Sequence, residues 1–134
     1  MKKVLVPMDG SPRAIETLRA VVREGPGNVG RIEVVNVQPL FDRYASRWIP
    51  RSARQAWRAE RSRTALAPAL AVLAGTTIPW GVHTLAGRAD TVILAAARAL
   101  KADEIAGGVP RRAIGTIAVP AGLGIAALVW LAAD

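Results

Sequence analysis

The tetrapeptide DGSP at residues 9–12 has the residue types and the order expected of a ligand-binding loop. It follows a short apolar run at residues 4–6, which is typical of a buried strand, and Pro7 ends that run by removing a backbone donor. Aspartate and glycine accept turn conformations, serine can cap a helix, and proline suits the first helical position. The stretch therefore predicts a strand, a tight loop and a helix N-terminus. In an open parallel sheet ligands bind at this place, because free amide donors and the positive end of the helix dipole converge there.

The other residue types that carry chemistry do not assemble into a catalytic or metal-binding set. The chain has no cysteine, which excludes a disulfide framework and a thiolate metal site and favours a cytoplasmic location. His83 is the single histidine and has no carboxylate close to it in sequence, so we interpret it as a strand residue rather than a metal ligand. Neither paired carboxylates nor a nucleophile with an adjacent base can be assembled. The sequence therefore predicts a protein that is not an enzyme, with no catalytic residues and no metal site; weak ATPase activity is left open.

The formal net charge of +8 is concentrated in one segment, because seven arginines fall between residues 43 and 63. Two interpretations stay open for this segment: a stripe that faces phosphates or an anionic membrane, and a solvated helix face. Trp48 and Trp57 could stack on bases or lie in the core. We expect nucleic-acid binding to be weak and non-specific at most. The arginines that recur at spacings of three and four, and so align along one side of a helix, are Arg51, Arg54, Arg58 and Arg61.

Hydrophobic periodicity divides the chain into alternating strands and helices. A helix is expected over residues 12–24, and another follows Asp90, which we expect to be its N-cap. A longer helix is expected over residues 52–74, where Pro68 should kink or split it. The expected strands cover residues 4–6, 31–37, 80–85 and 105–108.

Strands that alternate with helices of about ten residues or more indicate βαβ units and hence a parallel sheet. The predicted fold class is α/β: an open parallel sheet in a single domain over residues 1–134. We expect the strand order three, two, one, four, with the first strand in the middle of the sheet.

Three stretches, in this order, resemble the universal stress proteins: KVLVPMDGS, VVNVQP and HTLAGRADTVILAAARALKADEIAGG. The similarity covers about residues 3–119, although residues 40–80 match only in layout. The resemblance implies a small Rossmann-like domain with an adenine-nucleotide cleft. It also implies a protein that is usually a homodimer and that acts in the stress response.

The resemblance also implies candidate nucleotide-binding residues. Pro7 and Asp9 match the residues that border the adenine and the ribose, and Met8 stands between them. Val37 matches the strand residue whose backbone meets the base. ATP or AMP is the implied ligand, with magnesium only if a triphosphate binds.

Gly107 and Gly108 match the end of the fourth strand, where the ATP-binding members begin a phosphate loop. That loop has the form Gly, two residues, Gly, nine residues, and then Gly with Ser or Thr. In this chain Arg111 stands at the second glycine and Pro-Ala, residues 120–121, at the final pair. A phosphate nest needs backbone donors and residues free to adopt positive φ, which proline and arginine do not supply. We therefore expect nucleotide affinity to be weak or lost, with ATP binding micromolar or poorer.

Arg111 and Arg112 are the remaining candidate phosphate contacts in this loop. A guanidinium attracts phosphate by charge and by its forked donors, although with less defined geometry than a nest of backbone amides. The alternative is that both arginines are solvated loop residues.

Residues 113–133 carry no charged side chain over a length that could span a bilayer. Several glycines, Pro120 and many alanines disfavour insertion, so we expect no membrane span and interpret the segment as the family's last helix, from about Ala121. The family's fifth strand is then missing or altered. An apolar helix of this kind needs further cover, which predicts a homo-oligomer, most simply a twofold dimer, with Trp130 near the contact.

Two function classes stay open at this point. The first is a universal-stress-protein-like module with weak or lost adenine-nucleotide binding. The second is a nucleotide-independent interaction or membrane-associated domain that uses the apolar C-terminal segment and the basic helix. An adenine nucleotide that co-purifies with the protein would distinguish them.

Overall fold

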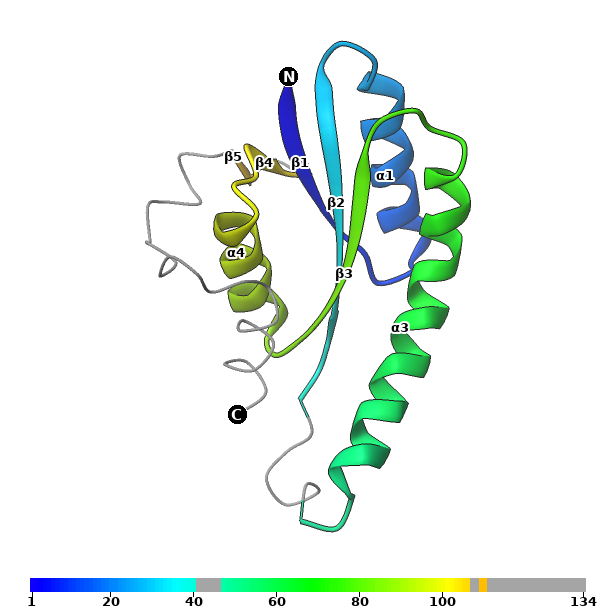
Figure 1. Cartoon of the computed structure of the whole chain (residues 1–134), viewed down its shortest axis with the longest axis vertical. Helices are drawn as coiled ribbons and strands as arrows, with labels where there is room; N and C mark the ends of the chain where they lie inside the picture. Colours follow the sequence, from blue (N-terminus) through cyan, green and yellow to red (C-terminus); the bar gives the residue numbers. More distant parts are fainter. Residues whose placement is uncertain (41–46, 107–108, 111–134) are drawn as a thin grey trace.

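The described part of the chain, residues 1–40, 47–106 and 109–110 of a computed structural model, forms a sheet with helices on both faces (Figure 1). Strands and helices alternate along it, which confirms the predicted α/β class. The helices are α1 (Pro12–Glu24), α3 (Arg51–Leu73) and α4 (Ala89–Ala99). The strands are β1 (Lys2–Pro7), β2 (Val29–Gln38), β3 (Trp80–Ala86), β4 (Glu104–Ile105) and β5 (Val109–Pro110).

Strand β1 lies in the middle of the sheet. It pairs in parallel with β2 on one side and with β4 on the other, and β2 pairs in parallel with β3. The order β3-β2-β1-β4 confirms the prediction. The short β5 then pairs antiparallel with β4, a pairing that the sequence does not predict. The predicted fourth strand is only partly described, because Gly107 and Gly108 lie outside the described residues.

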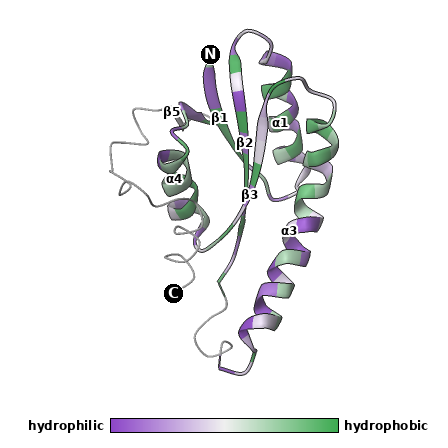
Figure 2. Ribbon diagram, in the orientation of Figure 1, coloured by the Kyte–Doolittle hydropathy of each residue, from purple (hydrophilic) through white to green (hydrophobic). Residues whose placement is uncertain are grey.

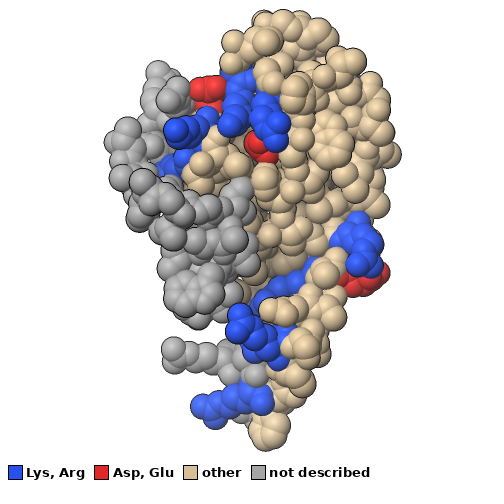
Figure 3. All heavy atoms as spheres, in the orientation of Figure 1, with Lys and Arg blue, Asp and Glu red and all other residues tan. Residues whose placement is uncertain are grey.

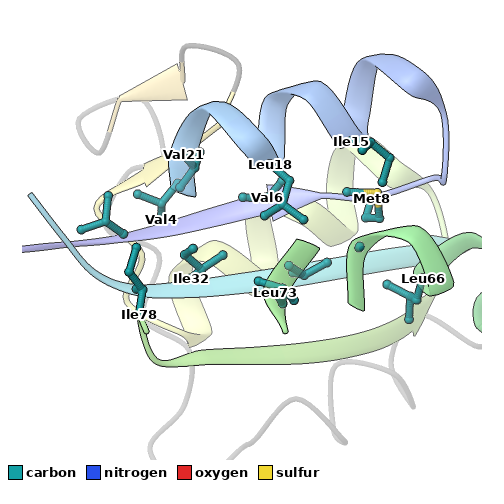
Figure 4. Close-up of a cluster of buried hydrophobic side chains, with 13 residues drawn as sticks. Val4, Val6, Met8, Ile15, Leu18, Val21, Ile32, Leu66, Leu73 and Ile78 are labelled. Carbon is teal, nitrogen blue, oxygen red and sulfur yellow. The ribbon is translucent and has the colours of Figure 1, made fainter. Parts of the chain in front are cut away.

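One face of the sheet packs against α1 and α3 through an apolar cluster (Figure 4). Leu18 of α1 is fully buried there, and burial of a leucine side chain contributes about 1.5–3 kcal/mol. The 3.6-residue period of α1 directs its apolar side chains toward the sheet, as predicted. The strands supply Val4, Val6, Ile32 and Val34, and the helices supply Ile15, Leu18, Val21, Leu66, Ala69 and Leu73.

The opposite face packs against α4 through a smaller apolar cluster. Leu5 and Val35 face this side because side chains alternate along a strand. Leu85 of β3 completes the strand contribution, and α4 meets it with Val92 and Ala96. Together the two clusters hold the carboxyl ends of β1 and β2 between helices on both sides.

The N-termini of α1 and α4 are built differently. Ser11 caps α1, since its Oγ accepts the Ala14 N–H at 3.2 Å, and Pro12 follows as the first helical residue. The prediction that Asp90 caps α4 is wrong, because the N-cap position is Arg88. Asp90 lies in the first turn, where the Thr91 N–H donates to its carboxylate at 2.9 Å. That hydrogen bond and the charge of Arg88 lower the pKa of Asp90.

Helix α3 runs without interruption from Arg51 to Leu73, so Pro68 does not split it as one of the two predicted outcomes required. Pro68 lies on the exposed side of the helix. The carbonyl that loses its partner there belongs to the exposed Thr64 and can be hydrated instead. Trp48 and Trp57 are 75 % and 41 % exposed, so the interpretation of these tryptophans as core residues is also wrong.

Among the described residues no helix is long and apolar enough to cross a membrane. The segment 113–133, on which the question of a membrane span and the place of Trp130 depend, lies outside them.

Candidate functional site

A cavity of about 360 Å³ opens at the carboxyl ends of β1 and β2, beside the start of α1. Strand β1 has β2 on one side and β4 on the other, so the chain leaves the sheet in opposite directions at this point. Open α/β sheets bind ligands at such a switch point. The predicted loop at residues 9–12 borders this cavity, which we call the cleft.

One wall of the cleft is apolar. Met8 is 2 % exposed and continues the strand pairing beyond Pro7, because its N–H donates to the Val35 carbonyl at 2.8 Å. Val37 follows two residues later on the same side of β2. Ile93 of α4 and Ala106, after β4, complete this wall. An apolar wall of this kind suits a flat aromatic ring.

The opposite rim of the cleft is polar and comes from the start of α1. Asp9, Ser11, Arg13 and Thr17 line it. Thr17 is one helical turn after Arg13, and its hydroxyl donates to the Arg13 carbonyl at 3.0 Å. The rim therefore offers a carboxylate, two hydroxyls and a guanidinium within one cavity.

Asp9 is held as a carboxylate by its own loop. The Ser11 N–H donates to Asp9 Oδ1 at 2.8 Å. Hydrogen bonds from the Ser11 hydroxyl and N–H lower the pKa of Asp9, which outweighs the opposing effect of its partial burial. At neutral pH Asp9 is therefore an acceptor that can take a hydrogen bond from a ligand hydroxyl.

Gly10 holds the loop against α3. Its φ of +83° is a left-handed conformation, and a Cβ at this position would lie 3.0 Å from the Ala65 Cα. Both the conformation and the close approach require glycine. The position of Asp9 is consequently fixed by the packing of the loop on α3.

Two buried amides fix the end of β2 beside this loop. The Asn36 Nδ2 donates to the Met8 carbonyl at 2.7 Å, and the Gln38 Nε2 donates to the Asn36 Oδ1 at 2.8 Å. Asn36 and Gln38 are 1 % and 6 % exposed. Both residues belong to the stretch VVNVQP, on which the family resemblance rests in part.

The structure brings together four predicted site residues, Pro7, Met8, Asp9 and Val37, around the cleft. The other predicted site residues, Gly107, Gly108, Arg111 and Arg112, lie outside the described residues.

Sequence reasoning missed Arg13 and Thr17 as lining residues. The signal was available, because both belong to the first turn and a half of the helix that the DGSP loop begins. Over the described ranges, no three side chains of the His, Cys, Asp and Glu types gather as a metal site would require.

A separate charged cluster lies between β2 and β3. His83 is a strand residue, as predicted, and the fold brings to it a carboxylate that is distant in sequence: its Nε2 lies 2.5 Å from Glu33 Oε2. Arg31 contacts the other carboxylate oxygen. Burial alone would raise the pKa of Glu33, but the hydrogen bonds and charges of Arg31 and His83 lower it overall. Gly81 leaves room for this carboxylate, since a Cβ there would lie 2.6 Å from Glu33 Oε2.

Comparison with known proteins gives a direct result for the family. A family model described as the Universal stress protein family matches residues 1–117. The chain belongs to this family. No curated protein matches the chain.

Solved structures of universal stress proteins share the fold of this family member. A crystal structure of a universal stress protein from Burkholderia pseudomallei is similar at 25 % identity and a TM-score of 0.61, over 78 % of each chain. A universal stress protein in complex with cAMP is similar at 17 % identity and a TM-score of 0.51, over 97 % of this chain and 88 % of the other. The second likeness shows the fold alone.

Proposed function

We propose that the cleft binds an adenine nucleotide weakly and that the protein acts as a nucleotide-responsive module in the stress response. The observation that carries the proposal is one cavity at the switch point of the sheet with an apolar wall and a polar rim. Membership of the universal stress protein family and a family structure that holds cAMP support the choice of an adenine nucleotide.

In this proposal the adenine packs on Met8, Val37 and Ile93. The ribose lies at Asp9, whose carboxylate accepts a hydroxyl hydrogen. Arg13 is the described cation in the same cavity and is suited to the first phosphate. In the sequence after Gly108 the prolines lack backbone donors and the arginines resist the positive φ that a phosphate nest requires, so we expect ATP to bind in the micromolar range or more weakly.

The proposed role is binding rather than catalysis. Asp9 is the one acid among the described residues that line the cleft, and its carboxylate already accepts the Ser11 N–H and organises the loop. We place the protein in the cytoplasm as a homodimer, on the basis of the family and of the apolar sequence after residue 113. Light scattering on the intact chain and on a chain truncated before Ala121 tests the dimer, and two stable monomers would contradict it.

Titration calorimetry with adenosine, AMP and ATP tests the nucleotide proposal. Asp9→Asn keeps the size of the side chain and removes its charge, so we expect it to weaken adenosine binding about tenfold through the lost ribose contact. Glu16→Gln on the exposed side of α1 is the matched control and should change nothing, since Glu16 pairs only with Arg19 and Arg23 among the described residues. Equal affinity in the protein and Asp9→Asn would remove Asp9 from the site, and failure of all three ligands to bind would overturn the proposal.

A further inference from the structure

A second cavity lies beside the cleft, between the end of β2 and α3. It measures about 420 Å³, and we call it the α3 cavity. Asp9 and Val37 line both the cleft and the α3 cavity, so the two spaces meet at these residues. Helix α3 contributes Glu60, Arg61 and Thr64 to the second one.

The strand side of the α3 cavity includes two buried amide side chains. Asn36 and Gln38 line it, both more than nine-tenths buried, and their hydrogen bonds to each other and to the Met8 carbonyl fix their orientation. Each amide nitrogen carries a second hydrogen beyond the one used in these bonds. Oriented, buried donors in the wall of a cavity are a feature of ligand sites, since a buried polar group without a use reduces stability.

Along one side, or stripe, of helix α3 the residues change from hydrophilic in the N-terminal half to apolar in the C-terminal half. Its C-terminal half is apolar and packs on the sheet, while its N-terminal half continues beyond the end of the sheet (Figure 1) and is hydrophilic (Figure 2). The buried residues of the helix all lie in the C-terminal half, from Ser62 onward. Spacings of three and four place on this one stripe Arg51, Arg54, Arg58, Ser62, Leu66, Ala69 and Leu73.

The arginine half of this stripe therefore extends the face that packs on the sheet, past the ends of the strands where the α3 cavity opens. Figure 3 shows basic side chains gathered along this part of α3. Partial burial and the nearby charge of Arg54 both lower the pKa of Arg58, which indicates that like charges crowd together here.

Arg61 is the arginine that reaches the α3 cavity. Its guanidinium stacks over the Trp57 ring at 4.9 Å from the centroid. Stacking uses the flat face of the group and leaves its in-plane N–H donors directed outward. The neighbouring carboxylates are engaged, since Glu60 pairs with Arg63 at 2.6 Å and Asp9 accepts the Ser11 N–H.

We propose that the α3 cavity is a phosphate-binding subsite, in which Arg61 and the Asn36 and Gln38 amides contact the anion and the arginine half of α3 supplies positive potential. The subsite needs no adenine and takes phosphate groups as a chemical class. Its use by the outer phosphates of a nucleotide in the adjoining cleft rests on the proposed function. The subsite would supply phosphate contacts on the other side of Asp9. These contacts would compensate for the nest of backbone donors that the family's phosphate loop provides and that this sequence does not retain.

Inorganic tripolyphosphate is the probe, because it carries phosphate without a base. Calorimetry on the intact protein at low salt should detect binding that Arg61→Gln weakens about tenfold, or about 1.4 kcal/mol. Arg61→Lys keeps the charge and should retain part of the affinity. Arg19→Gln removes the same charge from an exposed site on α1, where the arginine pairs loosely with Glu16 at 3.8 Å, and should change the affinity less than about twofold.

The outcomes separate this subsite from the nucleotide proposal. Tripolyphosphate binding that depends on Arg61, with no adenosine binding, supports the subsite and overturns the adenine cleft. Loss of ATP affinity in Arg61→Gln with adenosine affinity unchanged supports both and links them. Absence of tripolyphosphate binding, or equal weakening in Arg61→Gln and Arg19→Gln, overturns the subsite whatever adenosine does.

Discussion

The two faces of the sheet differ in whether their strands bury a charged side chain. On the face under α1 and α3, the inward side chains of β1 and β2 are apolar as far as Val34. On the face toward α4, β2 carries Glu33, 2 % exposed and level with Leu5 of β1. A buried carboxylate is tolerated there because the adjacent β3 ends the described sheet and presents His83, while the half-exposed Arg31 reaches in from solvent. Burial of a charge thus depends on access for its partners, not on depth alone.

Shortening a buried side chain on the apolar face should lower the free energy of unfolding more than any other substitution in this series. Leu18→Ala leaves a cavity between α1 and β1, and we expect it to lower the free energy of unfolding by about 2–5 kcal/mol in urea titrations. Leu70→Ala in α3 is the control. Leu70 is 42 % exposed, so its truncation should lower the free energy of unfolding by less than about 1 kcal/mol. Equal effects from both would mean that this cluster is loosely packed.

On the face toward α4, removing one partner of the buried Glu33 carboxylate should lower the free energy of unfolding by less than Leu18→Ala does. Arg31→Gln leaves Glu33 buried with His83 alone, and we expect a loss of about 1–2 kcal/mol in the free energy of unfolding. The figure lies below that for a fully buried pair because Arg31 is 42 % exposed at its side chain. Arg31→Gln in a Glu33→Gln background should have little further effect. Full additivity of the two substitutions would show that the pair does not interact.

Acid should remove the contribution of the same carboxylate. The folded pKa of Glu33 lies below its ordinary value of 4.5, so its contribution is present above that value and is lost as pH falls through the folded pKa. We expect the difference in unfolding free energy between the protein and Glu33→Gln to shrink from about pH 7 to about pH 3. A difference that stays constant over this range would mean that the charge of Glu33 contributes nothing.

Gly81→Ala should give the smallest effect of the series. The added Cβ would lie 2.6 Å from Glu33 Oε2 and would displace a carboxylate at the end of a flexible side chain. We expect a net loss of up to about 1 kcal/mol, since alanine also restricts the unfolded chain. Gly75→Ala is the control, because its Cβ would meet only the Val72 carbonyl at 3.6 Å and should be neutral or slightly stabilising. A Gly81→Ala protein more stable than Gly75→Ala would show that the Glu33 carboxylate is free to move.

Local signals in the sequence predicted most of the fold. The apolar run at residues 4–6 and the Ser11-Pro12 pair indicated β1 and the start of α1, and both are confirmed. The strand order followed from the alternation of strands and helices, because crossover connections leave few arrangements. Asp90 was misjudged as an N-cap because a cap depends on where the first turn of the helix begins. The expected split at Pro68 does not occur, because Pro68 lies on the exposed side of α3, which the sequence alone did not identify.

The site was predicted in part. Asp9 was predicted from the pattern of strand, tight loop and helix start, and Val37 from the resemblance to the universal stress proteins; both line the cleft. The contact between His83 and Glu33 joins residues fifty positions apart and depends on the register of β2 against β3, which pairs Glu33 with Gly81 and Val35 with His83. Register follows from the assembled sheet and not from either strand alone. The α3 cavity was missed for the same reason, since its walls come from elements that are distant in the sequence.

The central position of β1 has a consequence for how the chain folds as it is synthesised. The first strand to emerge pairs with β2 soon afterwards, but its other edge must wait for β4, about a hundred residues later. The Lys3 N–H donates to Asp103 Oδ2 and the Asp103 N–H donates to the Lys3 carbonyl, each at 2.8 Å. Contacts this distant in sequence slow folding. Until β4 arrives, an apolar strand edge stays open to pairing with other chains, so the nascent protein passes through an aggregation-prone stage that the finished sheet conceals.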